Sequence, residues 1–119
     1  MPYIERFQTR NNSVKLLLDE NLPHELRQLI PGHAVFTVAF MHYDGLANGR
    51  LLERAAADGF DAMLSLDSGL EQQRNLSTLP CAIVLIRGRS NRVADLSPLL
   101  PGIIDALKTL KPQTLVTVG

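Results

Sequence analysis

The sequence predicts an α/β fold in which helices cover both faces of a parallel β-sheet. The runs Leu16-Leu17-Leu18 and Ala82–Ile86 are continuously apolar, which is typical of strands buried on both faces of such a sheet. Segments with apolar residues at helical spacing alternate with these strands, as they do in α/β proteins. At 119 residues, the chain is long enough for one domain with one hydrophobic core.

The first elements are expected to be a strand at residues 14–18, a helix, and a second strand at residues 33–40. Asn21 is a suitable N-cap for the helix, and Pro23 suits its first turn. Leucine and isoleucine recur through the helix at helical spacing, and Pro31-Gly32 is expected to end it.

Asn48 is expected to cap the next helix, which Gly59 ends. A third strand follows at residues 61–66, then a short helix around residues 70–76. The apolar run Ala82–Ile86 is the fourth strand.

The last helix is expected to begin at Ser97-Pro98 and to end at Pro112, before a fifth, edge strand at residues 114–118. The common small form of this fold has strand order 2-1-3-4-5. Residues 1–12 are polar and aperiodic, which predicts a flexible N-terminal extension to a domain at residues 13–119.

The composition excludes several classes of protein. Twelve basic and twelve acidic residues give a net charge of zero, so no general attraction to nucleic acid is expected, although a local basic patch remains open. A single cysteine, Cys81, rules out an intrachain disulfide. No run of about 18 apolar residues or secretory signal is recognisable, so we expect a cytoplasmic protein that does not enter the membrane.

Carboxylates follow two of the predicted strands. Asp19, Glu20 and Asn21 end the first strand, and Asp67 ends the third. In the order 2-1-3-4-5 these strands are neighbours about 4.8 Å apart, so Asp19 and Asp67 would share one crevice. Such a pair suits Mg²⁺ or Mn²⁺, with Glu20 as a third ligand or a base. The alternative is that both aspartates only cap helices or form turns.

Two polar loops lie near the same predicted edge of the sheet. Arg87, Arg89 and Arg92 follow the fourth strand and could bind phosphates or the acidic groups of a partner. Gln73 and Asn75 follow Asp67 and could contact a nucleotide backbone. Either loop could instead be an ordinary solvated surface.

Five segments together resemble one branch of the bacterial PIN-like domains, relatives of the toxin nucleases of toxin–antitoxin pairs. They are residues 17–23 (Leu-Leu-Asp-Glu-Asn-Leu-Pro), 45–52 (Gly-Leu-Ala-Asn-Gly-Arg-Leu-Leu), 59–61 (Gly-Phe-Asp), Asp67, and 73–76 (Gln-Arg-Asn-Leu). The resemblance covers residues 14–118. It implies a PIN-like three-layer α/β/α sandwich with a mainly parallel sheet of four to five strands, in the order 2-1-3-4 with the fifth at an edge.

The resemblance also implies a function. Asp19 matches the first acid of the PIN site, and Asp67 matches the acid that closes the third strand, with Ser65 where threonine is usual. Asn48 stands where many relatives have an aspartate, so the set of acids is smaller. The implied activity is a metal-dependent ribonuclease, with RNA as substrate and an antitoxin as partner.

In this hypothesis Asp19 and Asp67 bind Mg²⁺ or Mn²⁺, Glu20 and Asn48 assist, and Arg87 or Arg89 holds phosphate. Asn21, Gln73 and Asn75 are further candidates for contacting substrate. The alternative is a non-catalytic PIN-like module that binds RNA or a protein partner. A homodimer is compatible with both hypotheses.

Overall fold

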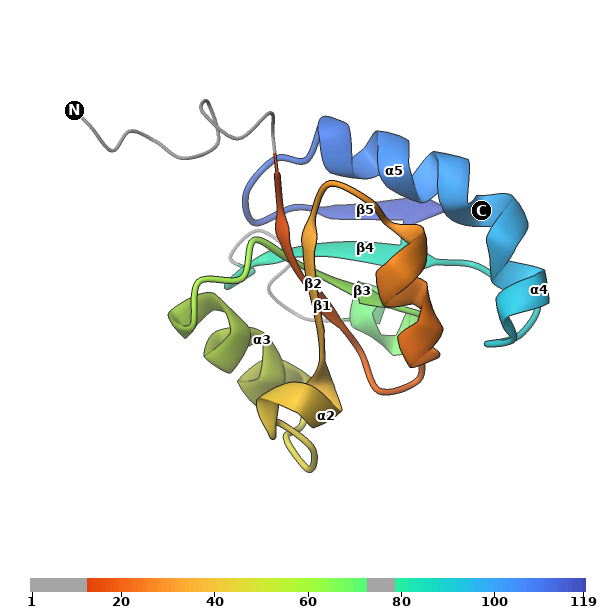
Figure 1. Cartoon of the computed structure of the whole chain (residues 1–119). Coiled ribbons are helices and arrows are strands. Elements are labelled where there is room, and N and C mark those ends of the chain that lie inside the picture. The colour runs from red at the N-terminus through yellow and green to blue at the C-terminus, as the bar shows by residue number, and fades with distance from the viewer. Residues whose placement is uncertain (1–12, 73–78) are drawn as a thin grey trace.

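A computed structural model describes residues 13–72 and 79–119. Its centre is a five-stranded, all-parallel sheet of order β2-β1-β3-β4-β5 (Figure 1). The strands are β1 (Lys15–Leu18), β2 (Ala34–Thr37), β3 (Ala62–Ser65), β4 (Ala82–Ile86) and β5 (Leu115–Val118). The α/β class and the strand order predicted from the sequence are confirmed.

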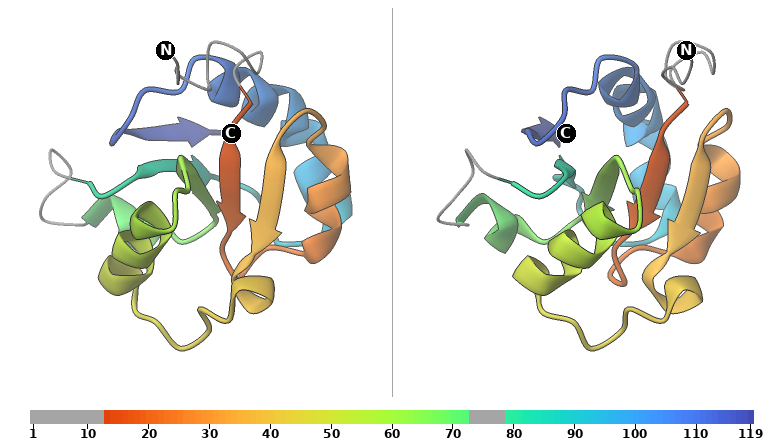
Figure 2. Two further views of the ribbon diagram at one scale, coloured as in Figure 1. Left: turned by 60° about the vertical axis from the view of Figure 1, so that its left-hand side comes forward. Right: turned by 90° about the vertical axis from the view of Figure 1, so that its left-hand side faces the viewer.

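Helices lie on both faces of this sheet, which gives three layers (Figure 2). The helical segments are η1 (His24–Leu29), α2 (Val38–Met41), α3 (Asn48–Ala57), η2 (Ser68–Gln72), α4 (Val93–Leu96), η4 (Ser97–Leu99) and α5 (Leu100–Lys108), where η marks a 3₁₀ helix. Among the described residues, no helix is long and apolar enough to cross a membrane.

The run of three leucines in β1 shows how the two cores form. Leu16 and Leu18 pack with η1, α4 and α5 on one face of the sheet. Leu17 packs with α2, α3 and η2 on the opposite face. Successive side chains of a strand point to opposite faces, so a strand covered on both faces needs apolar side chains on both. This packing explains why β1 and β4 have continuous apolar runs.

The second strand is shorter than its sequence predicts. β2 ends at Thr37, and Val38–Met41 forms α2 instead of continuing the strand. The Thr37 hydroxyl accepts a hydrogen bond from the Phe40 N–H at 3.0 Å, which caps the helix. The expected strand at residues 33–40 was therefore wrong in its last part, because a side-chain cap outweighs the β-propensity of Val38 and Phe40.

Both predicted asparagine caps are also wrong. The helix after β1 is a 3₁₀ helix whose N-cap is Pro23, and the N-cap of α3 is Ala47. Neither helix has a side-chain cap, because the amides of Asn21 and Asn48 bond to residues at the end of β3 and just beyond it.

The last helical region begins earlier than expected. It starts with α4 at Val93 and continues through η4 into α5. Ser97, the expected N-cap, lies inside this run, and its hydroxyl donates to the carbonyl of Val93 at 2.9 Å. Pro98 and Pro101 stand in the first turns of η4 and α5, where a missing N–H costs little.

The short helix expected around residues 70–76 is η2, which begins at Ser68. Its predicted end lies outside the described residues, as does the extension at residues 1–12.

Candidate functional site

The candidate site lies where β1 and β3 end side by side. Leu18 of β1 is in register with Leu64 of β3, and the backbone N–H of Asp19 donates to the Leu64 carbonyl at 3.0 Å. Asp19 follows β1 directly, and Asp67 comes two residues after β3. Parallel strands end at the same edge of a sheet, so the topology brings the two acidic segments together.

Ser65 joins these segments. Its hydroxyl donates to Asp19 Oδ2 at 2.6 Å and accepts a hydrogen bond from the Asp67 backbone N–H at 3.0 Å. The Asn21 amide also donates to this hydroxyl, at 3.5 Å. Ser65 has no exposed surface. A buried hydroxyl with one donor and two lone pairs is fully used by these three contacts.

The carboxylate of Asp67 is held from two directions. The Asn48 amide at the start of α3 donates to Oδ2 at 2.9 Å, and the Gly69 N–H donates to Oδ1 at 2.9 Å. A Cβ added at Gly69 would lie 3.0 Å from Oδ1, so this position favours glycine. Asn48 thus contributes to the orientation of an acid 19 residues away in the sequence.

The carboxylate of Asp19 is buried, and none of the described cationic side chains forms an ion pair with it. Only 7% of the residue is exposed, and its Oδ1 accepts a hydrogen bond from the Glu20 N–H at 2.8 Å. In the described part of the chain, no lysine, arginine or histidine forms an ion pair with Asp19 or Asp67. Buried charges in proteins are usually paired with an opposite charge or coordinate a metal, so this arrangement is compatible with a bound cation.

The donor set suits a hard cation such as Mg²⁺ or Mn²⁺ that keeps several of its waters. Within residues 13–72 and 79–119, each carboxylate oxygen of Asp19 and Asp67 accepts one side-chain or backbone hydrogen bond, which leaves a further lone pair. The described residues contain no group of three or more His, Cys, Asp or Glu side chains placed to hold a metal. Glu20, the predicted third ligand, is exposed and joins no such group.

The residues predicted to contact phosphate or substrate differ in whether other side chains already bind them. Arg87, directly after β4, forms an ion pair with Glu71 of η2, the helix that follows Asp67. Arg89 is exposed, and none of the contacts among the described residues involves its guanidinium. Asn21 contacts Ser65 and the Leu66 N–H, while Gln73 and Asn75 lie outside the described residues.

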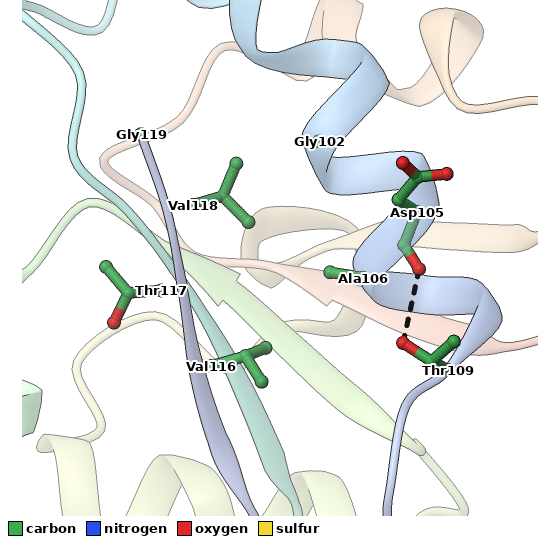
Figure 3. Close-up of a pocket in the computed structure, with 8 residues that line it drawn as sticks. All are labelled: Gly102, Asp105, Ala106, Thr109, Val116, Thr117, Val118 and Gly119. Atoms are coloured by element: carbon green, nitrogen blue, oxygen red, sulfur yellow. Dashed lines mark hydrogen bonds between the residues drawn. The ribbon is translucent and has the colours of Figure 1, made fainter.

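A shallow hollow lies elsewhere, between α5 and the edge strand β5 (Figure 3). Its lining includes the carboxylate of Asp105 and the hydroxyl of Thr109, which donates to the Asp105 backbone carbonyl at 3.4 Å. It contains no second acid, no base and no basic side chain. β4 separates it from β3 and Asp67, so it is not part of the acidic site.

Comparisons of the chain with protein-family models, with curated proteins and with solved structures find no match.

Sequence reasoning named Ser65 only as the residue in place of a usual threonine, and it gave Ser65, Gly69 and Glu71 no role in the site. A signal for Ser65 was present, since it is a polar residue at a buried position of an apolar strand. Such a residue needs a hydrogen-bond partner nearby. Gly69 and Glu71 carried no comparable signal, because their importance comes from contacts made only in the folded chain.

Proposed function

We propose that this protein is a metal-dependent ribonuclease whose site is the Asp19–Ser65–Asp67 group with Asn48. The observation that carries the proposal is the buried Asp19 carboxylate, which shares the Ser65 hydroxyl with Asp67 and has no cationic partner among the described residues. Carboxylates arranged in this way are suited to hold a divalent cation against a phosphate group.

In this proposal Asp19 and Asp67 bind Mg²⁺ or Mn²⁺ through the lone pairs that their protein contacts leave free. The ion would supply polarisation of the scissile phosphate and activation of water. Ser65 and Asn48 fix the two carboxylates before substrate arrives, which avoids reorganisation during the reaction. Glu20 is exposed and follows Asp19 directly in the chain, and it is the candidate base.

Arginine supplies the phosphate contacts. Arg89 is the better candidate, because Arg87 is already engaged by Glu71. Asn21, Gln73 and Asn75 are proposed to contact the RNA backbone beside the two acids.

The resemblance to PIN-like domains extends this proposal. It supports a toxin of a toxin–antitoxin pair, acting on RNA in the cytoplasm, with an antitoxin protein as its inhibitor. We also propose that the chain forms a homodimer.

The test is cleavage of single-stranded RNA with Mn²⁺ by the wild-type chain and by Asp19→Asn. We expect the substitution to reduce the cleavage rate by at least about 100-fold, because it removes a charged ligand of the ion. Asp105→Asn is the matched control, since Asp105 lies on α5 away from the site. Equal cleavage by wild type and Asp19→Asn would reject the proposal.

The second candidate is a non-catalytic module that binds RNA or a protein. It is favoured by the small number of acids, since the described residues hold no cluster of three. Calorimetry with Mn²⁺ separates the two: RNA binding without Mn²⁺ binding or cleavage supports the module.

A further inference from the structure

Phe40 is an exposed aromatic side chain at the same edge of the sheet as the acidic site. It is 67% exposed, and Leu29, at 37%, is the other large apolar side chain exposed among the described residues. The remaining described phenylalanines, Phe36 and Phe60, pack into the core around α2 and α3. The exposure of Phe40 is therefore unusual for this chain.

The topology places Phe40 near Asp19. Leu18 of β1 is in register with Thr37 of β2, so Asp19 and α2 both begin where these neighbouring strands end. Figures 1 and 2 show α2 at the same edge as the connection from β1 to η1. One strand spacing and one helical turn separate the backbones of Phe40 and Asp19 by on the order of 10 Å, a span that two or three nucleotides of an extended single strand can cover.

Contacts with Thr37 and Phe36 hold Phe40 in place. The Thr37 hydroxyl accepts the Phe40 N–H, and the ring of Phe36 lies 5.8 Å from that of Phe40 at an angle of 36°. Phe36 in turn meets Phe60 edge-on at 5.8 Å. The rings of Phe60, Phe36 and Phe40 thus form a row from the core to the surface, and the ring of Phe40 is the exposed one. A side chain fixed in this way loses little entropy when it binds a flat ligand.

We propose that Phe40 is a stacking platform for a base of single-stranded RNA bound at the acidic site. This inference rests on the proposed function and adds a residue that recognises the substrate. Single-stranded RNA is typically bound by stacking its bases on exposed aromatic rings. With a net charge of zero, the chain gains little from general electrostatic attraction, so stacking would carry a larger share of the affinity.

A protein partner fits these observations less well. A stable protein interface buries about 800 Å² on each side around an apolar centre. The described surface offers only two large exposed apolar side chains, and around Phe40 the exposed Ala39 and His42 are small or polar, while Met41 packs partly buried against the core. One ring is enough for a base and too little for the centre of a stable interface.

The first test measures affinity for a short single-stranded oligoadenylate with Mg²⁺, on the Asp19→Asn background so that the RNA stays intact. Phe40→Ala and Phe40→Leu should each weaken binding by about 5- to 150-fold, because both lack an aromatic face. Leu29→Ala is the matched control and should bind like the parent. Unchanged affinity in Phe40→Ala would overturn the proposal.

The second test uses fluorescence, since the natural chain has no tryptophan. Phe40→Trp should retain binding, and RNA should quench its emission by stacking, whereas the emission of Leu29→Trp should stay constant. Emission of Phe40→Trp that changes with protein concentration in the absence of RNA would instead indicate contact with a second copy and overturn the proposal.

The two proposals fail in different ways. If wild type cleaves RNA and Phe40→Ala binds and cleaves equally well, only the stacking role is wrong. If Asp19→Asn cleaves like wild type while Phe40→Ala binds weakly, the assignment of the metal ligands is wrong and the stacking role stands. If wild type does not bind RNA, both proposals are wrong.

Discussion

Two aspartates at opposite edges of the sheet are held in contrasting ways. Asp58 follows α3 near the start of β1, and its carboxylate accepts hydrogen bonds from the Tyr43 hydroxyl and from Arg54 Nε at 3.2 Å. Lys15 Nζ also donates to its backbone carbonyl at 2.7 Å. Asp19, at the other edge, accepts hydrogen bonds from a serine hydroxyl and a backbone N–H.

The difference lies in where the neutralising charge comes from. The Tyr43 hydrogen bond, and then Arg54 and Lys15, lower the pKa of the Asp58 carboxyl below its ordinary value. Asp58 is thus an exposed acid with cations supplied by the chain itself. Asp19 is buried, and within the described residues no side chain supplies such a charge. Asp58 therefore has the contacts of a structural acid, whereas the surroundings of Asp19 are compatible with the metal-ligand role proposed for it.

Among the substitutions that test this difference between Asp19 and Asp58, Ser65→Ala should have the largest effect. It removes a donor to buried Asp19 and an acceptor for the Asp67 N–H. Leaving such groups unsatisfied costs about 1–3 kcal/mol, so the free energy of unfolding in urea should fall by that amount. Mn²⁺ affinity should fall as well. Ser68→Ala, an exposed serine of η2, is the control. A Ser65→Ala chain as stable as wild type would show that the hydroxyl does not hold the two segments together.

Gly69→Ala tests the Asp67 side of the site with a smaller change. The added methyl group would lie 3.0 Å from Asp67 Oδ1 and push the carboxylate aside. We expect Mn²⁺ affinity to fall about tenfold, as for other residues that support a metal ligand. Gly49→Ala serves as control, because its methyl group would meet nothing within 4 Å. Full Mn²⁺ affinity in Gly69→Ala would mean that Asp67 does not bind the ion in this orientation.

The sequence was sufficient to predict the sheet because burial leaves a direct mark on composition. The continuous apolar runs of β1 and β4 could be recognised because both faces of these strands are covered. β2 is an edge strand in which Ala34 is exposed and the other residues are only partly buried, and its end could not be located from the sequence. At Thr37 the hydrogen bond from the Phe40 N–H to the threonine hydroxyl favours a helix over a longer strand. A single hydrogen bond of this kind leaves no recognisable pattern in the sequence.

The site was harder to predict for a related reason. Asp19 and Asp67 could be proposed because strand order alone brings strand ends together. The role of Asn48 as a donor to Asp67 was not evident, because an asparagine at a helix start is more often a cap. The Arg87–Glu71 pair depends on how η2 packs beside β4, which no local pattern encodes.

Titration of Tyr43 examines the Asp58 edge of the sheet. Burial, with the neighbouring Asp58, raises the pKa of Tyr43 from 10.0 to about 12. Because the folded pKa is the higher one, the stabilisation is complete below pH 10 and is lost as pH rises through about 12. Phenolate absorbance in a Tyr3→Phe background, which leaves one tyrosine, should show this shift.

Tyr43→Phe separates the two edges. Loss of the hydroxyl should lower the free energy of unfolding by about 0.5–1.5 kcal/mol at neutral pH and leave RNA cleavage unchanged. It should also weaken the acid dependence of stability. The lowered pKa of Asp58 stabilises the fold above the pKa of the unfolded chain, and this contribution disappears as pH falls through the folded value. A cleavage rate that fell in Tyr43→Phe would mean that the two edges are coupled, and Asp58 could not then be treated as purely structural.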